Sequence, residues 1–217
     1  MPDLPKLPDL PDLPDEREEL LRLGAATLGE SGGHAMRPRI RAAWHGATVC
    51  GPAWCARNDP GDNLAIHVAA ATAPAGAVIV ASVGDVIEIG YWGEVLTTAA
   101  EARGVVGLVI DGGVRDVDAL RGHGFGAFAA TIALRGATKE RPGEVAGTVT
   151  VGDVDVYTGD WIVGDADGVV VIRAGELDDV LAAGRARAAK EAAMFEALRG
   201  GATTLDLLGL DPTKIAF

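Results

Sequence analysis

The chain has 217 residues, 48% of them apolar, and a formal net charge of −12. This length suits one domain with a sizeable core, and the acidic surface disfavours nucleic acid because a duplex would repel it. Neither a signal peptide nor a membrane-spanning run of about 18 apolar residues is visible, so we expect a cytoplasmic protein without a membrane anchor.

The first segment, MPDLPKLPDLPDLPDE, places a proline at every third position from Pro2 to Pro14. This period matches the polyproline II repeat, so residues 1–14 are predicted to form a flexible tail. Recognition by a proline-binding partner is the alternative. Asp15 and Glu18 have the spacing of a capping box and predict a helix over 19–30.

Segments typical of strands and of helices alternate in the next part of the chain. The predicted strands cover 47–58, 77–84, 105–111 and 126–134, and the predicted helices cover 63–73, 93–104 and 116–124. This alternation indicates an α/β domain with a largely parallel sheet. The two cysteines, Cys50 and Cys55, lack a second Cys/His pair, which disfavours zinc and predicts reduced thiols in the core.

Beyond residue 143 the pattern changes to short strands and turns up to residue 172. We expect this β-rich stretch to pack on the α/β part within a single domain spanning 15–217. A long helix is predicted over 176–198, followed by a tail.

A charged pair follows the predicted strand over 105–111 in the sequence LVIDGGVRDVDAL, where Arg115 stands beside Asp116. Ligands of parallel α/β sheets bind beyond the carboxyl ends of strands. An arginine fork suits a carboxylate or an enolate oxygen, and an aspartate is a hard ligand for Mg²⁺. Glu94 opens the preceding helix and could hold a water of the cation, while Gly93 lets free helix amides face an anion. The alternative is that Asp116 caps the helix that follows it.

Three segments together resemble the RraA-like family: GDNLAIH, YWGEVLTTAAEARGVVGLVIDGGVRDVDAL and GDWIVGDADGVVVI. The resemblance covers roughly residues 20–210. The family contains 4-hydroxy-4-methyl-2-oxoglutarate aldolases and regulators of an RNA-processing enzyme. It implies a layered α/β/β/α domain, of the swivelling phosphohistidine-domain type, that assembles as trimers or pairs of trimers with active sites between subunits.

The resemblance also implies roles for individual residues. Asp116 would bind Mg²⁺ or Mn²⁺, Arg115 would hold the keto acid and stabilise its enolate, and Glu94 would orient a water bound to the cation. The amides of Val95 and Leu96, after Gly93, would bind the pyruvate carboxylate. The family often has aspartate at position 94, so this chain departs from it by one methylene.

A carboxylate interrupts the apolar face of the predicted helix over 176–198. Leu177, Val180, Leu181, Phe195 and Leu198 share one stripe, and Glu191 lies inside it. A charge there must be paired, bound to a metal or at an interface. An ion pair with Arg187, four residues earlier, is one interpretation. The resemblance implies another, a catalytic Glu191 that reaches a neighbouring subunit's site, with Glu30 as a further acid near it. For Glu30 the alternative is a solvent charge at a helix end.

The resemblance, together with these residues, implies a lyase that cleaves 4-hydroxy-2-oxo acids and releases pyruvate, with oxaloacetate decarboxylation as a side activity. A divalent cation would polarise the keto group, and Arg115 would stabilise the enolate. No lysine occupies an apolar strand position, which disfavours a Schiff-base aldolase. His67 could bond substrate or simply be a satisfied helix histidine. The alternative function is a regulator without catalysis.

Overall fold

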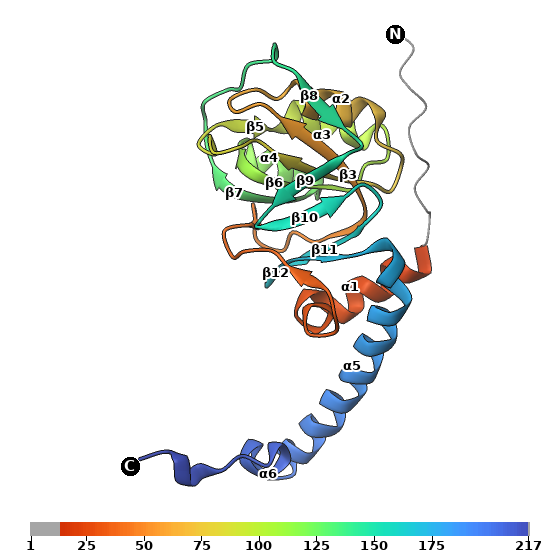
Figure 1. Cartoon of the computed structure of the whole chain (residues 1–217), viewed down its shortest axis with the longest axis vertical. Coiled ribbons are helices and arrows are strands. Elements are labelled where there is room, and N and C mark those ends of the chain that lie inside the picture. The colour runs from red at the N-terminus through yellow and green to blue at the C-terminus, as the bar shows by residue number, and fades with distance from the viewer. Residues whose placement is uncertain (1–13, 217) are drawn as a thin grey trace.

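The computed structural model describes residues 14–216 (Figure 1). The predicted flexible tail therefore lies outside the described residues, apart from Pro14, which begins helix α1 (Pro14–Gly29). Among residues 14–216, none of the helices combines the length and apolar character that a bilayer crossing requires.

Parallel strands form the middle of one ten-stranded sheet. They are β3 (Val49–Asn58), β4 (Val78–Ser82), β6 (Gly107–Val114) and β7 (Gly126–Ile132). The short strand β5 (Gly90–Trp92) pairs in parallel with the end of β6. Helices α2 (Leu64–Thr72), α3 (Glu94–Glu101) and α4 (Val117–His123) follow the strands as the alternating pattern predicts.

Strand β6 is longer than predicted because it continues through Gly112, Gly113 and Val114. A Cβ at Gly113 would lie 2.4 Å from the carbonyl oxygen of Ile89. Glycine is therefore needed for the close approach of the segment that carries β5.

Part of the late β-rich stretch joins this sheet, and part packs on it as predicted. Strand β11 (Trp161–Asp165) pairs with β3 and β12 (Gly168–Ile172) pairs with β11, both antiparallel. Strand β8 (Gly143–Val145) also pairs with β3. Strands β9 (Thr148–Val151) and β10 (Val154–Tyr157) form a separate hairpin.

One segment between α1 and β3 reaches both ends of the sheet. Its first strand, β1 (His34–Ala35), pairs with β12, and its second, β2 (Arg41–Ala42), pairs with β7. β1 and β2 are the first and last strands in the order of the sheet, yet only a few residues separate them along the chain. The two ends of the sheet must therefore approach each other, so the sheet is curled.

Alternate side chains along the strands enter different cores, as the two-residue period of a strand requires. On β4, Ile79 belongs to the core shared with α2 and α3, while Val80 belongs to the core shared with the β9–β10 hairpin. On β11, Trp161 packs against α1 and α5 (Leu177–Arg199). These three cores confirm the expected α/β/β/α layering. Cys50 and Cys55 are buried and free, and burial raises the pKa of each thiol to about 12.

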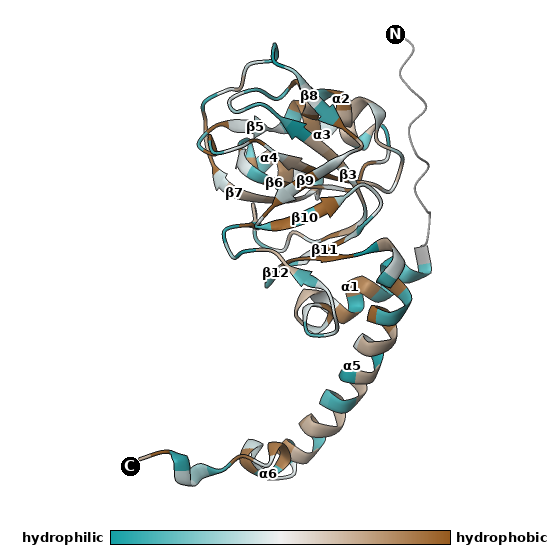
Figure 2. Ribbon diagram, viewed as in Figure 1, coloured by the Kyte–Doolittle hydropathy of each residue, from teal (hydrophilic) through white to brown (hydrophobic). Residues whose placement is uncertain are grey.

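Helix α1 bends at Gly24, whose φ is 79°, and the Asp165 carboxylate accepts a hydrogen bond of 2.8 Å from the next amide, that of Ala25. Helix α5 begins against the domain and then projects away from it (Figure 1). At its far end lies α6 (Thr204–Leu208), a helix that the sequence did not predict. Figure 2 shows hydrophobic residues on α6, and Leu208 is 53% exposed.

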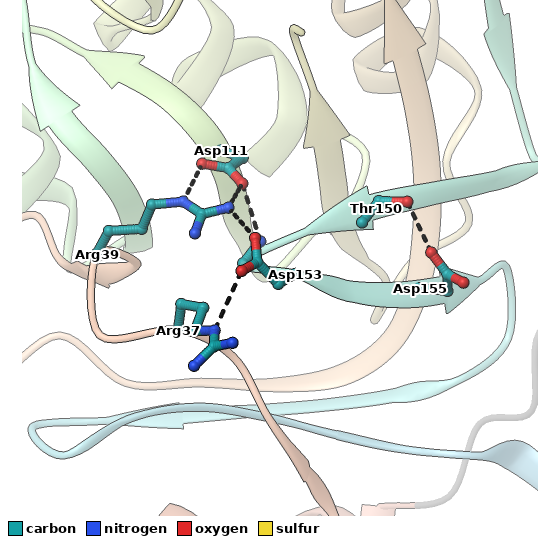
Figure 3. A network of polar contacts seen from close by, with 7 residues as sticks. Arg37, Arg39, Asp111, Thr150, Asp153 and Asp155 are labelled. Carbon is teal, nitrogen blue, oxygen red and sulfur yellow. Dashed lines mark hydrogen bonds and ion pairs between the residues drawn. The ribbon is translucent and has the colours of Figure 1, made fainter. Parts of the chain in front are cut away.

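A polar network attaches the β9–β10 hairpin to Asp111 of β6 (Figure 3). The guanidinium of Arg39 donates two hydrogen bonds to Asp111 and one to Asp153, and the amide of Gly152 donates to Asp111 at 2.9 Å. The two oxygens of the Asp111 carboxylate therefore both accept hydrogen bonds within this network.

Candidate functional site

A small cavity lies where β5 and β6 end side by side. Its volume is about 150 Å³, and the residues that line it include Asn63, His67, Gly93, Arg115, Asp116 and Lys139. At about 30 Å³ per water, this is room for roughly five waters or one small organic acid. The predicted site residues of both strand ends are therefore brought together, because β5 pairs directly with β6.

Asp116 has an unusual backbone and an unexpected hydrogen-bond partner. Its φ of 56° and ψ of 37° are left-handed, which costs free energy in a residue other than glycine. Its side chain makes no capping bond to α4. Instead Oδ2 accepts a hydrogen bond of 3.0 Å from the amide of Glu94, at the start of α3. The alternative in which Asp116 caps the following helix is therefore wrong.

Gly93 is required by the closeness of this carboxylate. A Cβ at Gly93 would lie 2.3 Å from Oδ2 of Asp116, while the backbone of Gly93 is extended (φ −168°) and could otherwise accept any residue. The hydrogen-bond ladder of α3 begins with the Thr97 amide donating to the Gly93 carbonyl. The amides of Val95 and Leu96 precede that bond and have no acceptor within the helix, so they are available to an anion.

Arg115 lies at the mouth of the cavity, with its side chain 43% exposed. Its own amide donates to the Trp92 carbonyl, and its Nε lies 3.8 Å from Oδ2 of Asp116. This separation is an ion-pair contact but too long for a hydrogen bond, so the guanidinium donates no hydrogen bond to residues 14–216 and its donors can engage a ligand.

The backbone amide of Glu94 faces Asp116, but the side chain of Glu94 lies outside the cavity. It is 57% exposed and does not contribute to the lining of the cavity, although Gly93 and Val95 on either side of it do. The predicted role of Glu94 in holding a water therefore needs a different side-chain rotamer.

Two polar residues of the cavity were not assigned roles from the sequence. Asn63 donates from Nδ2 to the Tyr91 carbonyl at 2.7 Å, and its buried Oδ1 has no hydrogen-bond partner among the described residues. Lys139 reaches the cavity from the loop after β7 and donates to the Ala137 carbonyl at 3.3 Å. Burial and the charge of Lys139 lower the pKa of His67, which lines the same cavity. Asn63 is the third residue of the GDNLAIH motif, and this motif is the sequence signal that could have pointed to it.

Asp62 fixes the loop that carries Lys139. Its buried carboxylate accepts hydrogen bonds from the amides of Glu140 and Arg141 and from the Thr138 hydroxyl, besides the amide of Leu64. Burial alone would raise the pKa of the Asp62 carboxyl, but these donors outweigh it and lower the pKa to about 2. The carboxylate therefore stays charged and keeps the loop in place at any pH near neutrality.

The two other predicted acids lie elsewhere in the chain. Arg187 forms ion pairs with both Glu30 and Glu191, the second at 2.9 Å, on the side where α1 and α5 pack. The ion-pair interpretation of Glu191 is therefore present in the structure. Within a single chain neither glutamate contributes to the cavity, so their catalytic roles stay predictions that need a second subunit.

The donor set at the cavity fits a magnesium-like cation. Among the described residues no three His, Cys, Asp or Glu side chains converge on one point. Asp116 would therefore be the protein ligand, through the oxygen that Glu94 leaves free, and waters and substrate oxygens would complete the shell. Mg²⁺ is commonly held in this way, by one or two carboxylates with several waters.

The fold and the cavity define an α/β protein with a curled sheet and a small cavity lined by Arg115 and Asp116. A family model described as Aldolase/RraA matches residues 10–171, so the chain belongs to the Aldolase/RraA family.

Individual relatives agree with this membership. The chain is 33% identical over 150 residues to a protein of Halalkalibacterium halodurans named "Putative 4-hydroxy-4-methyl-2-oxoglutarate aldolase", covering 69% of this chain and 71% of the relative. An uncharacterized protein from Pseudomonas syringae has a similar structure (TM-score 0.77, 25% identity, 90% and 97% of the two chains). The RNA-processing inhibitor RraA from Thermus thermophilis also has a similar structure (TM-score 0.61, 26% identity, 68% of this chain and 92% of that one). The relatives therefore include both kinds of protein named in the sequence-based prediction.

Proposed function

We propose that this protein is a divalent-metal-dependent lyase that cleaves 4-hydroxy-2-oxo acids, of the 4-hydroxy-4-methyl-2-oxoglutarate type, and releases pyruvate. The observation that carries the proposal is the hydrogen bond from the Glu94 amide to Asp116, with Arg115 beside it and two free helix amides next to it. Around one small cavity, this arrangement would supply a ligand for a cation, a guanidinium and amides for an anion.

The charges of the cavity favour an acidic substrate with two carboxylates. The free amides of Val95 and Leu96 suit the carboxylate next to the keto group. Lys139, which approaches from another loop, supplies a second cation for a carboxylate at the other end of the substrate. Asn63 Oδ1 offers an acceptor for a hydroxyl because it is buried and receives no hydrogen bond from the described part of the chain.

Cleavage requires a proton to leave the substrate's C4 hydroxyl while the C3–C4 bond breaks. The bonding electrons then form the enolate of pyruvate, and C3 is protonated to give the product. Arg115 would stabilise the developing enolate oxygen with donors already in position. A bound divalent cation would supply Lewis-acid polarisation of the keto group. Glu94, together with Glu191 and Glu30 of a neighbouring subunit, would accept and return the proton through water.

Oxaloacetate provides a simpler test reaction. Loss of its C4 carboxylate as CO₂ gives the same enolate, so the proposal predicts decarboxylation in addition to cleavage. The alternative, a regulator that binds an RNA-processing enzyme, needs no turnover of either acid.

The deciding experiment measures pyruvate release from both acids with Mg²⁺ and with excess chelator. Chelation should abolish the activity, and Mg²⁺ or Mn²⁺ should restore it. Arg115→Ala should lower turnover by ~10²-fold, by analogy with removing one oxyanion donor. Arg103→Ala, which removes an exposed arginine beyond the far end of α3, is the matched control and should change turnover less than twofold.

Two results would contradict the proposal. Absence of pyruvate from a panel of 4-hydroxy-2-oxo acids would favour the regulator. Full activity in excess chelator, with borohydride fixing the substrate to Lys139, would replace the metal-dependent route by a Schiff-base route.

A further inference from the structure

Three glycines lie beside the side chain of Arg115, and they differ in whether the fold requires them. A Cβ at Gly90 would lie 2.4 Å from the Ala133 carbonyl oxygen and 3.2 Å from Cδ of Arg115. A Cβ at Gly93 would lie 2.3 Å from Oδ2 of Asp116 and 3.0 Å from Cγ of Arg115. Close packing therefore excludes a side chain at both of these positions.

The third glycine, Gly136, is not required by the fold. Apart from its chain neighbours, the only atom of residues 14–216 within 4 Å of a Cβ at this position would be Nη1 of Arg115, at 3.6 Å, which is an ordinary contact. The φ of Gly136 is not positive, so its backbone can accept a side chain without strain. Both Gly136 and Arg115 line the cavity. The missing side chain therefore leaves open space beside the guanidinium.

Gly136 lies next to one cation of the cavity and shares a loop with the other. The first is Arg115, and the second is Lys139, three residues further along the chain. In the proposed function Arg115 binds the oxygen on C2 of the substrate, and Lys139 binds the carboxylate beyond C4. The carbon chain between these groups, C3 and C4, therefore passes the loop segment that begins with Gly136.

The C4 atom of the proposed substrate carries four groups, and three of them already have places. C3 leads back to Arg115, the carboxylate is at Lys139, and the hydroxyl is at Oδ1 of Asn63, which is buried without a hydrogen-bond partner in the described part of the chain. Asn63 lies along the same loop, because its amide donates to the Thr138 carbonyl at 3.0 Å. The fourth group is a methyl, and the open space at Gly136 can receive it.

We infer that Gly136 is a specificity-determining residue whose missing side chain makes room for the fourth group on C4. The inference rests on the proposed function, from which it takes the orientation of the substrate. A methyl group is about as large as a water molecule, ~30 Å³, so a Cβ at position 136 would fill roughly a fifth of the cavity of about 150 Å³. A substrate with hydrogen in place of the methyl group leaves this space empty and tolerates an alanine there.

The test is Gly136→Ala in the full-length protein with Mg²⁺, assayed with three acids that differ at C4: 4-hydroxy-4-methyl-2-oxoglutarate, 4-hydroxy-2-oxoglutarate and oxaloacetate. The kcat/KM for the acid with the methyl group should fall by ~10- to 200-fold, the range for one methylene in a close-fitting pocket. For the other two acids it should change by less than about threefold, because they carry no methyl group to compete for the space. Gly175→Ala is the matched control, since its Cβ would meet no atom of residues 14–216 within 4 Å and it lies outside the cavity lining. It should alter none of the three values.

Two further measurements distinguish a loss of space from a loss of structure. The Tm of Gly136→Ala should not fall, because alanine lowers the conformational entropy of the unfolded chain and fits the backbone at this position. Pyruvate has no C4, so it should inhibit the variant and the parent with the same inhibition constant.

The possible outcomes separate the two proposals. A similar loss with all three acids, unchanged cleavage of the acid with the methyl group, or a lower Tm overturns the role of Gly136 and leaves the proposed function standing, provided that the parent releases pyruvate. A parent that releases no pyruvate from any of the three acids overturns the proposed function, and the role of Gly136 falls with it.

Discussion

Replacing Gly93 by alanine should disable the site while leaving the fold intact. The new Cβ would lie 2.3 Å from Oδ2 of Asp116, whereas ordinary contacts begin at 3.4 Å, so the carboxylate must move by about 1 Å. A displacement of this size at a catalytic group can cost ~10²-fold in rate. The hydrogen bond from the Glu94 amide would also lengthen or break. We therefore expect pyruvate release from oxaloacetate to fall by ~10²-fold.

The stability of the Gly93→Ala variant should change little. The backbone at position 93 is extended, and Asp116 is 41% exposed and can turn toward solvent. One hydrogen bond to a charged group contributes ~1.5–3 kcal/mol, and because this carboxylate is partly exposed the free energy of unfolding, from urea titration, should fall by no more than ~2 kcal/mol. Gly122→Ala is the matched control, because nothing lies within 4 Å of its Cβ position inside α4. It should stabilise the protein by ~0.5–1 kcal/mol and leave activity unchanged. If Gly93→Ala keeps activity within threefold, Asp116 is not the cation ligand.

Three further predictions concern other parts of the molecule. Glu191→Gln should lower aldol cleavage by ~10²-fold but affect oxaloacetate decarboxylation less, since that reaction has no hydroxyl to deprotonate. If both activities and their ratio stay unchanged, Glu191 is only the ion-pair partner of Arg187, and the regulator becomes the favoured function again. Sedimentation should show a trimer or hexamer, because the second half of α5 leaves Phe195 51% exposed, and a fully active monomer at micromolar concentration would contradict this. Asp62→Asn should flatten the acid side of the stability profile: a pKa lowered from 3.8 to about 2 stabilises the fold above pH ~4, and that contribution is lost as the pH falls through 2. Unfolding free energies of the parent and Asp62→Asn between pH 2 and 5 provide the test, and parallel profiles would refute it.

The sequence predicted the elements of the fold well where periodicity is strong. The strands around Ile79 and Leu108 have the expected apolar runs, and the helices between them follow in order. The rule that ligands bind beyond strand ends predicted that Arg115 and Asp116 share a strand end, and both line the cavity there. The joining of β11 to β3 was not predicted, because strand pairing over 100 residues leaves no local pattern.

The contacts within the site were harder to predict than its position. The left-handed backbone of Asp116, which turns its carboxylate to α3 instead of α4, arises from tertiary packing around Gly93. Lys139 looked like one charge among several in a loop, because its placement depends on a carboxylate 77 residues earlier, that of Asp62. Whether Glu191 reaches a site in another subunit depends on a surface that one chain does not contain.

The two short strands of the segment between α1 and β3 also have a consequence for solubility. β1 covers the centre of β12 at Val170 and Val171, and β2 covers the centre of β7 at Phe128 and Ala129. Uncovered edge strands expose unpaired amides and carbonyls that template aggregation. A single protease cut between Met36 and Ile40 would loosen the protection of both edges at once. Light scattering after limited proteolysis should then rise in step with cleavage of this segment, and cleavage without scattering would show that the edges are protected in another way.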